Sequence, residues 1–140
     1  MDAFDADVLI YAAVPGHPLG RRINAVLPAV PSESDPVTAL GSLLLVTELL
    51  TKPTREGAGH ELRALAAILA RLELLPVDEA TVDLSVALGA SYHLKPIDAV
   101  HLATAVGAGA DRFVTNNRKD FTLRISEIEV TYPDDLPDPG

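Results

Sequence analysis

The sequence contains no cysteine and no tryptophan, and aromatic residues make up only 4% of it. Without cysteine, neither a disulfide bond nor a thiolate metal site can form, whereas a hard cation held by oxygen ligands remains possible. With so few aromatic side chains, there is no platform on which nucleic-acid bases could stack. Any grip on a nucleic acid would therefore rest on contacts with phosphate groups and metal ions.

The sequence also lacks an apolar segment long enough to cross a membrane. The run LGSLLLVTELL, residues 40–50, is too short to span a bilayer and is interrupted by Glu48. No basic N-terminal region precedes an apolar signal segment. We therefore expect a cytoplasmic protein with no membrane partner. Its 140 residues, 48% of them hydrophobic, are enough for one domain with a substantial core.

The net charge of -9 gives no support for nucleic-acid binding, but its distribution does not exclude it. Five acidic residues and no lysine or arginine lie in residues 125–140. The remaining 124 residues carry fifteen acidic and eleven basic side chains. Four acidic residues considered below would account for this excess of four, and two divalent cations would neutralise it.

Apolar patterns and turn signals predict alternating strands and helices. Strands are expected over 1–4, 37–40, 73–77, 112–115 and 127–132, and helices over 17–27, 43–52, 58–72, 78–93 and 97–109. Ser42 is expected to cap the second helix and Pro53 to stop it, while Pro96 suits the first turn of the last helix. Residues 28–36 are expected to form a loop. The sequence thus predicts an α/β fold: a single domain over 1–131 with a mainly parallel central sheet flanked by helices, followed by a frayed acidic tail over 132–140.

Four acidic residues lie at the edges of apolar segments in separate parts of the chain: Asp5, Glu48, Asp98 and Asp120. Asp5 and Asp120 follow predicted strands, and the carboxyl ends of parallel strands lie at one edge of a sheet, where ligands bind. Glu48 and Asp98 can reach that edge from predicted helices. Burying acids in apolar helices is costly unless something pairs with them. A Mg²⁺ or Mn²⁺ ion between the four carboxylates would remove their repulsion and activate a water for phosphodiester hydrolysis.

Each acid also has a simpler interpretation when it is taken alone. Asp5 suits a helix cap or turn, and Glu48 suits a surface pair with Lys52 one turn later. Asp98 suits the first turn of a helix, where it complements the helix dipole, and Asp120 suits a turn.

Four segments, DADVLIY, LVTELLTKP, LKPIDAVHLATA and FVTNNRKDF, together resemble the signature of PIN-domain ribonucleases. The resemblance runs from about residue 4 to residue 131 and is strongest to the VapC-type toxins of toxin–antitoxin pairs. It implies that Asp5, Glu48 and Asp98 bind the metal. Many members have an aspartate where this chain has Asn117, so the resemblance implies Asp120 as the fourth acid.

The same resemblance assigns supporting roles around these acids. Thr115 and Asn116 would surround the metal or the attacking water, and Asp7 stands where the family has Asn, Ser or Asp. The family implies Mg²⁺- or Mn²⁺-dependent cleavage of single-stranded RNA, a homodimer, and inhibition by a cognate antitoxin whose tail covers the active-site groove.

Two other functions fit parts of the sequence. DADVL resembles the opening motif of haloacid-dehalogenase-type phosphatases, with Asp5 as nucleophile, but the Gly-Asp pair that those enzymes use later in the chain is missing. Alternatively, Asn117 marks a catalytically degenerate PIN fold whose acids bind a basic partner.

Three more residues bear on the site. His101, three positions after Asp98, is expected to be a packed helix residue rather than a metal ligand. Arg118 and Lys119 fit a phosphate contact and a solvated turn equally well.

Overall fold

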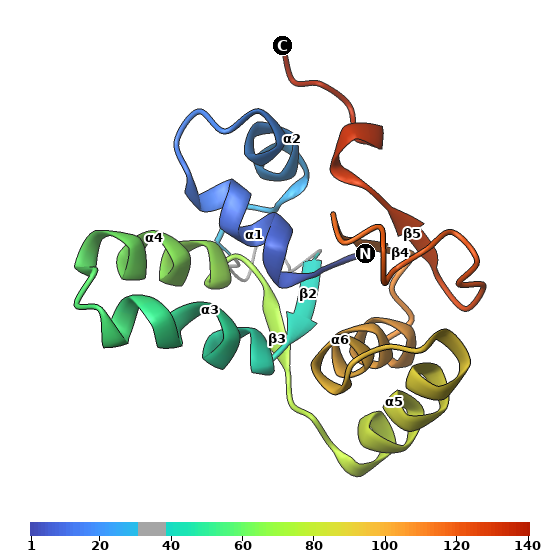
Figure 1. Cartoon of the computed structure of the whole chain (residues 1–140). Coiled ribbons are helices and arrows are strands. Elements are labelled where there is room, and N and C mark those ends of the chain that lie inside the picture. The colour runs from blue at the N-terminus through green and yellow to red at the C-terminus, as the bar shows by residue number, and fades with distance from the viewer. Residues whose placement is uncertain (31–38) are drawn as a thin grey trace.

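A computed structural model describes residues 1–30 and 39–140. The helices and strands of these residues alternate along the chain (Figure 1). The strands are β1 (Asp2–Phe4), β2 (Ala39–Ser42), β3 (Glu73–Leu75), β4 (Arg112–Val114) and β5 (Glu129–Thr131). The helices are α1 (Ala6–Ala13), α2 (Pro18–Val26), α3 (Leu44–Arg55), α4 (Gly59–Leu69), α5 (Glu79–Tyr92), α6 (Pro96–Gly107) and the short 3₁₀ helix η1 (Pro133–Asp135).

The strands form one sheet in the order β3-β2-β1-β4-β5, and every neighbouring pair is parallel. β1 lies at the centre, where Ala3 is in register with Leu40 of β2 and with Phe113 of β4. This confirms the predicted α/β fold with a parallel central sheet flanked by helices. The carboxyl ends of β1 and β4 consequently lie side by side at one edge.

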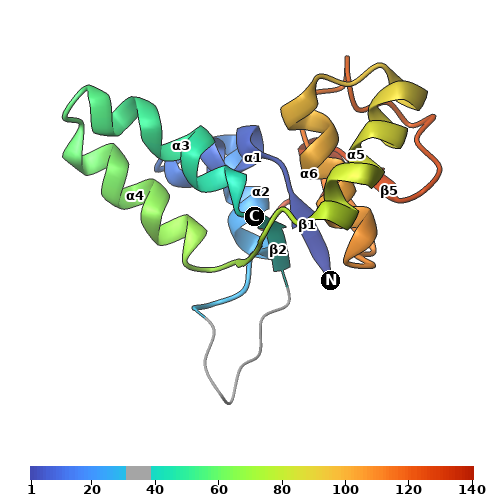
Figure 2. The ribbon, with the colours of Figure 1, turned by 90° about the horizontal axis from the view of Figure 1, so that it is seen from below.

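Helices cover both faces of the sheet (Figure 2). Helices α1 to α4 pack on one face and α5 and α6 on the other, and each layer has its own apolar cluster. Successive strand residues alternate between the two clusters, as the pleat requires: Phe4 faces the first cluster, whereas Ala3 faces the second. The short strands are therefore buried on both sides, and only their ends remain available for polar chemistry.

Two predicted boundaries around α1 and α3 differ from the structure. The apolar stretch after Asp5 was not assigned by its pattern; it forms α1, with Asp5 as the N-cap. The prediction that Pro53 ends the next helix is wrong, because Pro53 lies inside α3. Leu45, Leu49 and Pro53 recur every four residues on the buried side of α3, so burial of the proline ring offsets the missing hydrogen bond near the helix end.

The predicted cap at Ser42 is also displaced. Ser42 is the last residue of β2, and Leu43 occupies the N-cap position. The Ser42 hydroxyl nevertheless accepts a hydrogen bond from the Leu44 N–H at 3.1 Å. Ser42 therefore stabilises the first turn of α3 although it lies one position before the N-cap. The predicted loop over 28–36 and the first half of the predicted strand over 37–40 fall mostly on residues 31–38, outside the described residues.

The segment 132–140, expected to fray, makes several contacts with the domain. Tyr132 and Leu136 are 7% and 2% exposed, and the Tyr132 hydroxyl donates to the Phe121 carbonyl at 2.7 Å. Nη1 of Arg22 on α2 donates to the Leu136 carbonyl at 2.6 Å. Arg118 pairs with Asp134 and stacks on the Tyr132 ring, 4.5 Å from its centroid. These contacts join the start of the segment to the loop after β4.

In residues 1–30 and 39–140, no helix is both long enough and apolar enough to cross a membrane.

The crossing of α1 and α2 depends on Gly20. A β-carbon placed on Gly20 would lie 2.1 Å from the Tyr11 carbonyl oxygen. Asn24, one turn later, donates to the Ala12 carbonyl at 2.9 Å, which holds the two helices in the same close contact. The position of α1, which carries Asp7 and Tyr11, therefore depends on the absence of a side chain at residue 20.

We expect Gly20→Ala to lower the free energy of unfolding by roughly 2 kcal/mol or more, because backbone atoms must separate. Gly107→Ala is the matched control, since it lies at the end of α6 and its new methyl group would find its nearest neighbour at 3.9 Å. That control should be neutral or stabilising by up to about 1 kcal/mol. Urea unfolding measures both; equal effects of the two substitutions would contradict the close approach of α1 and α2.

Candidate active site

The acids of interest gather at the carboxyl edge of the sheet. Asp5 directly follows β1 and caps α1. The loop after β4 carries Asn116, Asn117 and Asp120. Glu48 projects from α3 on one face of the sheet, whereas Asp98 lies in the first turn of α6 on the other.

Asp5 is the most buried of the acids, with 5% of its surface exposed. Its Oδ1 accepts from the Ala6 N–H at 2.8 Å, and its Oδ2 accepts from the Thr115 hydroxyl at 2.8 Å. Burial raises the pKa of Asp5, while nearby His101 and the Thr115 hydroxyl partly offset this rise. The expected pairing of Thr115 with the site therefore takes a specific form: the hydroxyl fixes the orientation of the Asp5 carboxylate.

Asp7 lies in the first turn of α1, two positions after Asp5. Its Oδ1 accepts from the Val8 N–H at 2.7 Å and its Oδ2 from the Asn116 N–H at 3.1 Å. Burial, and to a smaller extent the charge of Asp5, raise the pKa of Asp7 to about 7. Sequence patterns did not distinguish Asp7 as a site residue, because its role depends on contact with a loop more than a hundred residues away.

Glu48 contacts His101 across the sheet edge. His101 is 2% exposed, and its Nε2 lies 2.5 Å from Oε2 of Glu48. Glu48 thus pairs with a residue 53 positions away; in the described residues Lys52 makes no ion pair, so the simpler pairing with Lys52 is not observed. His101 is packed in α6, as expected, but its ring also orients a site carboxylate. Its Nδ1 is buried without a hydrogen-bond partner among the described residues.

Asp98 is only partly buried, and the charges of the other three acids affect its pKa. Burial raises its pKa, and the charges of Asp5, Asp120 and Glu48 raise it further, in that order. His101 opposes this effect. All four acids predicted from the sequence therefore lie close enough for their carboxylates to interact electrostatically.

The loop after β4 holds its polar side chains in a local network. Asn117 Nδ2 donates to Asp120 Oδ2 at 3.0 Å, and the Asp120 N–H donates back to Asn117 Oδ1 at 3.3 Å. The Asn117 N–H donates to the Thr115 hydroxyl at 3.1 Å. Asn116 Nδ2 donates to the Tyr11 hydroxyl at 3.2 Å. Asn117 and Asp120 thus act as one unit, and the network continues through Thr115 to Asp5.

The donor set suits a hard divalent cation. Its groups are carboxylate oxygens, and burial raises the pKa of Asp5, Asp7 and Asp98, with a smaller rise from neighbouring acidic charges; a cation would relieve this penalty. In the conformation described, no three Asp, Glu or His side chains within residues 1–30 and 39–140 converge into a complete cation cage. Glu48 and Asp120 are instead engaged by His101 and Asn117. A cation would therefore compete with these two hydrogen bonds for its ligands.

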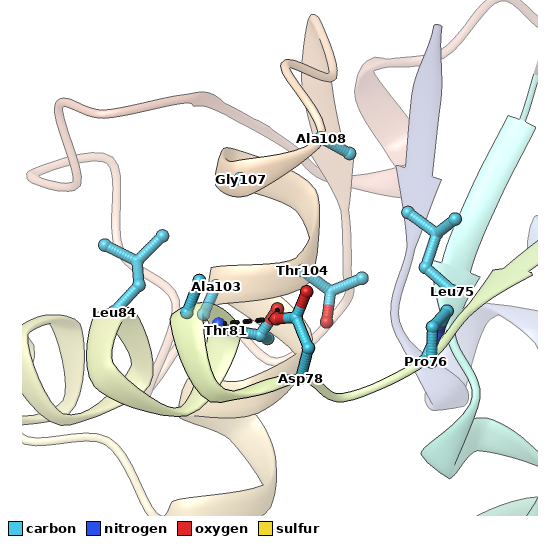
Figure 3. A pocket seen from close by; sticks show the side chains of 10 residues that line it. Leu75, Pro76, Asp78, Thr81, Leu84, Ala103, Thr104, Gly107 and Ala108 are labelled. Carbon is cyan, nitrogen blue, oxygen red and sulfur yellow. Dashed lines mark hydrogen bonds between the residues drawn. The ribbon is translucent and has the colours of Figure 1, made fainter.

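A separate pocket of about 330 Å³ lies between the end of β3 and helices α5 and α6 (Figure 3). Its acid, Asp78, is the N-cap of α5, where its Oδ1 accepts from the Thr81 N–H at 2.9 Å and from the Thr81 hydroxyl at 2.7 Å. The α6 side of the pocket is formed by Ala103 to Ala108, toward the opposite end of the helix from Asp98. Asp78 thus has a structural role, and the pocket contains none of the acids at the sheet edge.

The raised pKa of Asp7 generates a prediction for protein without metal. Between pH 4 and pH 7 the folded state retains a proton that the unfolded state, with an ordinary Asp pKa of 3.8, has released. Stability should therefore fall as pH rises through this window, by an amount on the order of 2–4 kcal/mol from this residue. Asp7→Asn removes the effect, so its stability in EDTA should decline less between pH 5 and pH 8.

Urea unfolding at several pH values tests this, with Asp83→Asn as the control because Asp83 is exposed on α5. Parallel stability curves for the wild type and Asp7→Asn would contradict the proposed proton on Asp7.

Comparisons with known proteins agree with this geometry. The family model described as "PIN domain" matches residues 3–124. No curated protein sequence matches the chain significantly. Among solved structures, a toxin–antitoxin complex from Klebsiella pneumoniae is similar, with a TM-score of 0.72 and 26% identity, covering 95% of this chain and 98% of that one.

Two more distant structures share the fold. VapBC2 from Rickettsia felis, bound to a promoter DNA fragment, has a TM-score of 0.72 and 18% identity over 94% of this chain and 97% of that one. DNA-bound VapBC from Salmonella typhimurium has a TM-score of 0.71 and 20% identity over the same shares. The chain therefore belongs to the PIN domain family, with the fold of its VapC-type toxin branch.

Proposed function

We propose that this protein is a Mg²⁺- or Mn²⁺-dependent endoribonuclease and the toxin of a toxin–antitoxin pair. The observation that carries the proposal is the meeting of Asp5, Glu48, Asp98 and Asp120, from four distant segments, at the carboxyl edge of the sheet. Membership in the PIN domain family supports it.

In this proposal, Asp5 and Asp98 hold the cation, with Glu48 and Asp120 completing its surroundings. The cation supplies a water of lowered pKa and charge neutralisation at the phosphodiester. The chain's own residues prepare the site: Thr115 orients Asp5 and His101 orients Glu48. Such fixed orientation reduces the reorganisation needed when substrate binds.

Asp7 and the loop after β4 have distinct parts in this arrangement. The backbone N–H of Asn116 holds Asp7, whose pKa of about 7 lets it carry a proton at Oδ1 or Oδ2 when no cation is near. Cation binding favours loss of that proton. The Asn116 Nδ2 donates to the Tyr11 hydroxyl, which directs the side-chain carbonyl of Asn116 toward a water or substrate contact in this proposal.

The alternative functions are less well supported. A phosphatase of the haloacid-dehalogenase type needs a Gly-Asp pair late in the chain, whereas the loop after β4 reads Thr-Asn-Asn-Arg-Lys-Asp. A degenerate binding module would bind no metal. Asn117 favours this alternative, because many family members have an aspartate at that position. Asn117 instead orients Asp120, which retains a carboxylate in the fourth segment.

Removal of any central carboxylate should abolish cleavage while the protein stays folded. We expect Asp5→Asn, Glu48→Gln and Asp98→Asn each to lower cleavage of a single-stranded RNA by at least about 100-fold, because the charge at the cation is lost. Asp83→Asn, an equal change of charge at an exposed position on α5, should retain activity. Circular dichroism checks the fold, and full activity of Asp98→Asn would refute this assignment.

Metal binding provides a test that does not depend on finding the right RNA. Titration calorimetry with Mn²⁺ should show binding to the wild type and loss of binding in Asp98→Asn, with proton release near pH 6 as Asp7 ionises. No binding to the wild type, or equal binding to both proteins, would favour the degenerate binding module.

The proposed partners are a second copy of the chain and an antitoxin. An open groove of about 560 Å³ between α3 and α6 contains Glu48 and Asp98, and Ile97 in its wall is 45% exposed. Apolar side chains beside the acids suit a protein segment that covers the site. Light scattering should give twice the chain mass of 14.8 kDa if the protein is a homodimer.

A further inference from the structure

A second depression adjoins the acids on the side away from α3. It has a volume of about 280 Å³ and lies between the end of α5, at Tyr92 and His93, and the loop after β4, at Lys119, Asp120 and Arg124. Asp120, one of the four acids, forms part of its wall, so the depression adjoins the acidic site through this residue. We refer to it as the 93–124 pocket.

The basic side chains around the 93–124 pocket differ in whether an ion pair already engages them. Arg118 in the same loop is committed, since it pairs with Asp134 and lies over Tyr132. Lys119 and Arg124 are exposed, and neither makes an ion pair within the described part of the chain. The pocket therefore contains two basic side chains that can bind an anion, in a protein whose net charge is -9.

One acid, Asp120, lies in the wall of this pocket, and a second, Glu127, is bonded to its wall residue Tyr92; both limit the positive charge there. Glu127 is bonded to the Tyr92 hydroxyl and, weakly, to the Ser126 N–H at 3.3 Å. Asp120 shares its Oδ2 with the Asn117 amide and belongs to the proposed cation site. A bound cation would compensate Asp120, leaving Lys119 and Arg124 to act on a phosphate in the pocket.

His93 adds an independent observation. It adopts the left-handed conformation, with φ 55° and ψ 43°, and among the described residues other than glycine it alone has positive φ. At this helix C-terminus glycine is the usual residue, because a side chain in this conformation is strained. The chain places an imidazole here, and His93 lines the pocket opposite Lys119. Strain at a non-glycine residue points to a gain from the side chain itself.

We propose that the 93–124 pocket binds a backbone phosphate of the RNA, adjacent to the phosphate that is cleaved, through Lys119, Arg124 and His93. The identity of the ligand as RNA rests on the proposed nuclease function, whereas the anion site itself does not. The pocket thus recognises the charge of the strand without reading its bases, which agrees with the shortage of aromatic side chains.

Two metal-free measurements in EDTA test this proposal, so neither depends on cleavage. In the first, inorganic pyrophosphate is added to ¹⁵N-labelled protein, and we expect amide shifts at His93 and over residues 119–124. In the second, the affinity for a fluorescein-labelled single-stranded oligouridylate is measured by anisotropy at several salt concentrations. The variants are the double substitution Lys119→Ala/Arg124→Ala and its control Arg55→Ala/Arg63→Ala, which removes two exposed cations from α3 and α4.

The double substitution should abolish the pyrophosphate shifts and weaken RNA binding about tenfold, with a shallower salt dependence by roughly 0.7 for each lost phosphate contact. The control should change affinity less than threefold. Equal weakening by both variants, or absence of pyrophosphate shifts in the pocket, would overturn the proposal. Shifts with pyrophosphate but unchanged RNA affinity would overturn the assignment to RNA and leave a site for free phosphate.

His93→Gly separates folding from binding. It relieves the strained backbone, so Tm should rise by about 2–4 °C, while RNA affinity should fall. A variant that gains stability and keeps full affinity for both RNA and pyrophosphate would exclude His93 from the site. If both binding tests succeed but no RNA is ever cleaved with Mn²⁺ present, the nuclease proposal fails and the anion pocket stands.

Discussion

Burial of carboxylates at the end of a parallel sheet, with their mutual repulsion added to it, is the constraint on which this structure depends. The short strands are covered on both faces, and Asp5, directly after the central strand, is buried with them. Hydrogen bonds from Thr115 and the Ala6 N–H compensate part of this cost at Asp5, and the Asn116 N–H does so at Asp7. The remaining cost appears as raised pKa values at Asp5, Asp7 and Asp98. Perturbed carboxyl pKa values gathered in one place are the reason that the cation site is proposed at this edge.

The same edge separates two kinds of surface. On the α3 side, the groove that holds Glu48 and Asp98 has mostly apolar walls, including Leu44 and Ile97, with Lys95 as its one basic side chain. On the α5 side, the neighbouring pocket carries Lys119 and Arg124. An extended polyanion that crossed the acids would therefore meet different chemistry on each side, which gives the site a direction. A protein segment that covered the apolar side alone would leave the basic side open.

Much of the fold and part of the site follow from sequence patterns. Asp5 and the loop with Asp120 could be assigned to one sheet edge because strand ends in parallel sheets share an edge, and α5 and α6 carry clear start signals at Asp78 and Pro96. Helix α1 could not be assigned, because its apolar stretch is short and fits a strand as well as a helix. The prediction at Pro53 was wrong because burial of its ring outweighs the tendency of proline to end a helix.

Contacts between distant residues were beyond reach of any local pattern. The pairing of Glu48 with His101 spans 53 positions and depends on how α3 and α6 meet over the sheet. The importance of Asp7 likewise appears only when the loop after β4 closes over α1. In both cases the residue type was visible in the sequence, whereas its neighbour was set by tertiary packing.

The contact between the C-terminal segment and the loop after β4 has a consequence for how this protein can vary. Tyr132 and Asp134 hold Arg118, two positions before Asp120, and Leu136 anchors the segment in the core next to α2. Residues 132–136 thereby fix one wall of the acidic edge. A substitution in this segment can therefore shift the loop that carries Asp120 without replacing any of the four acids.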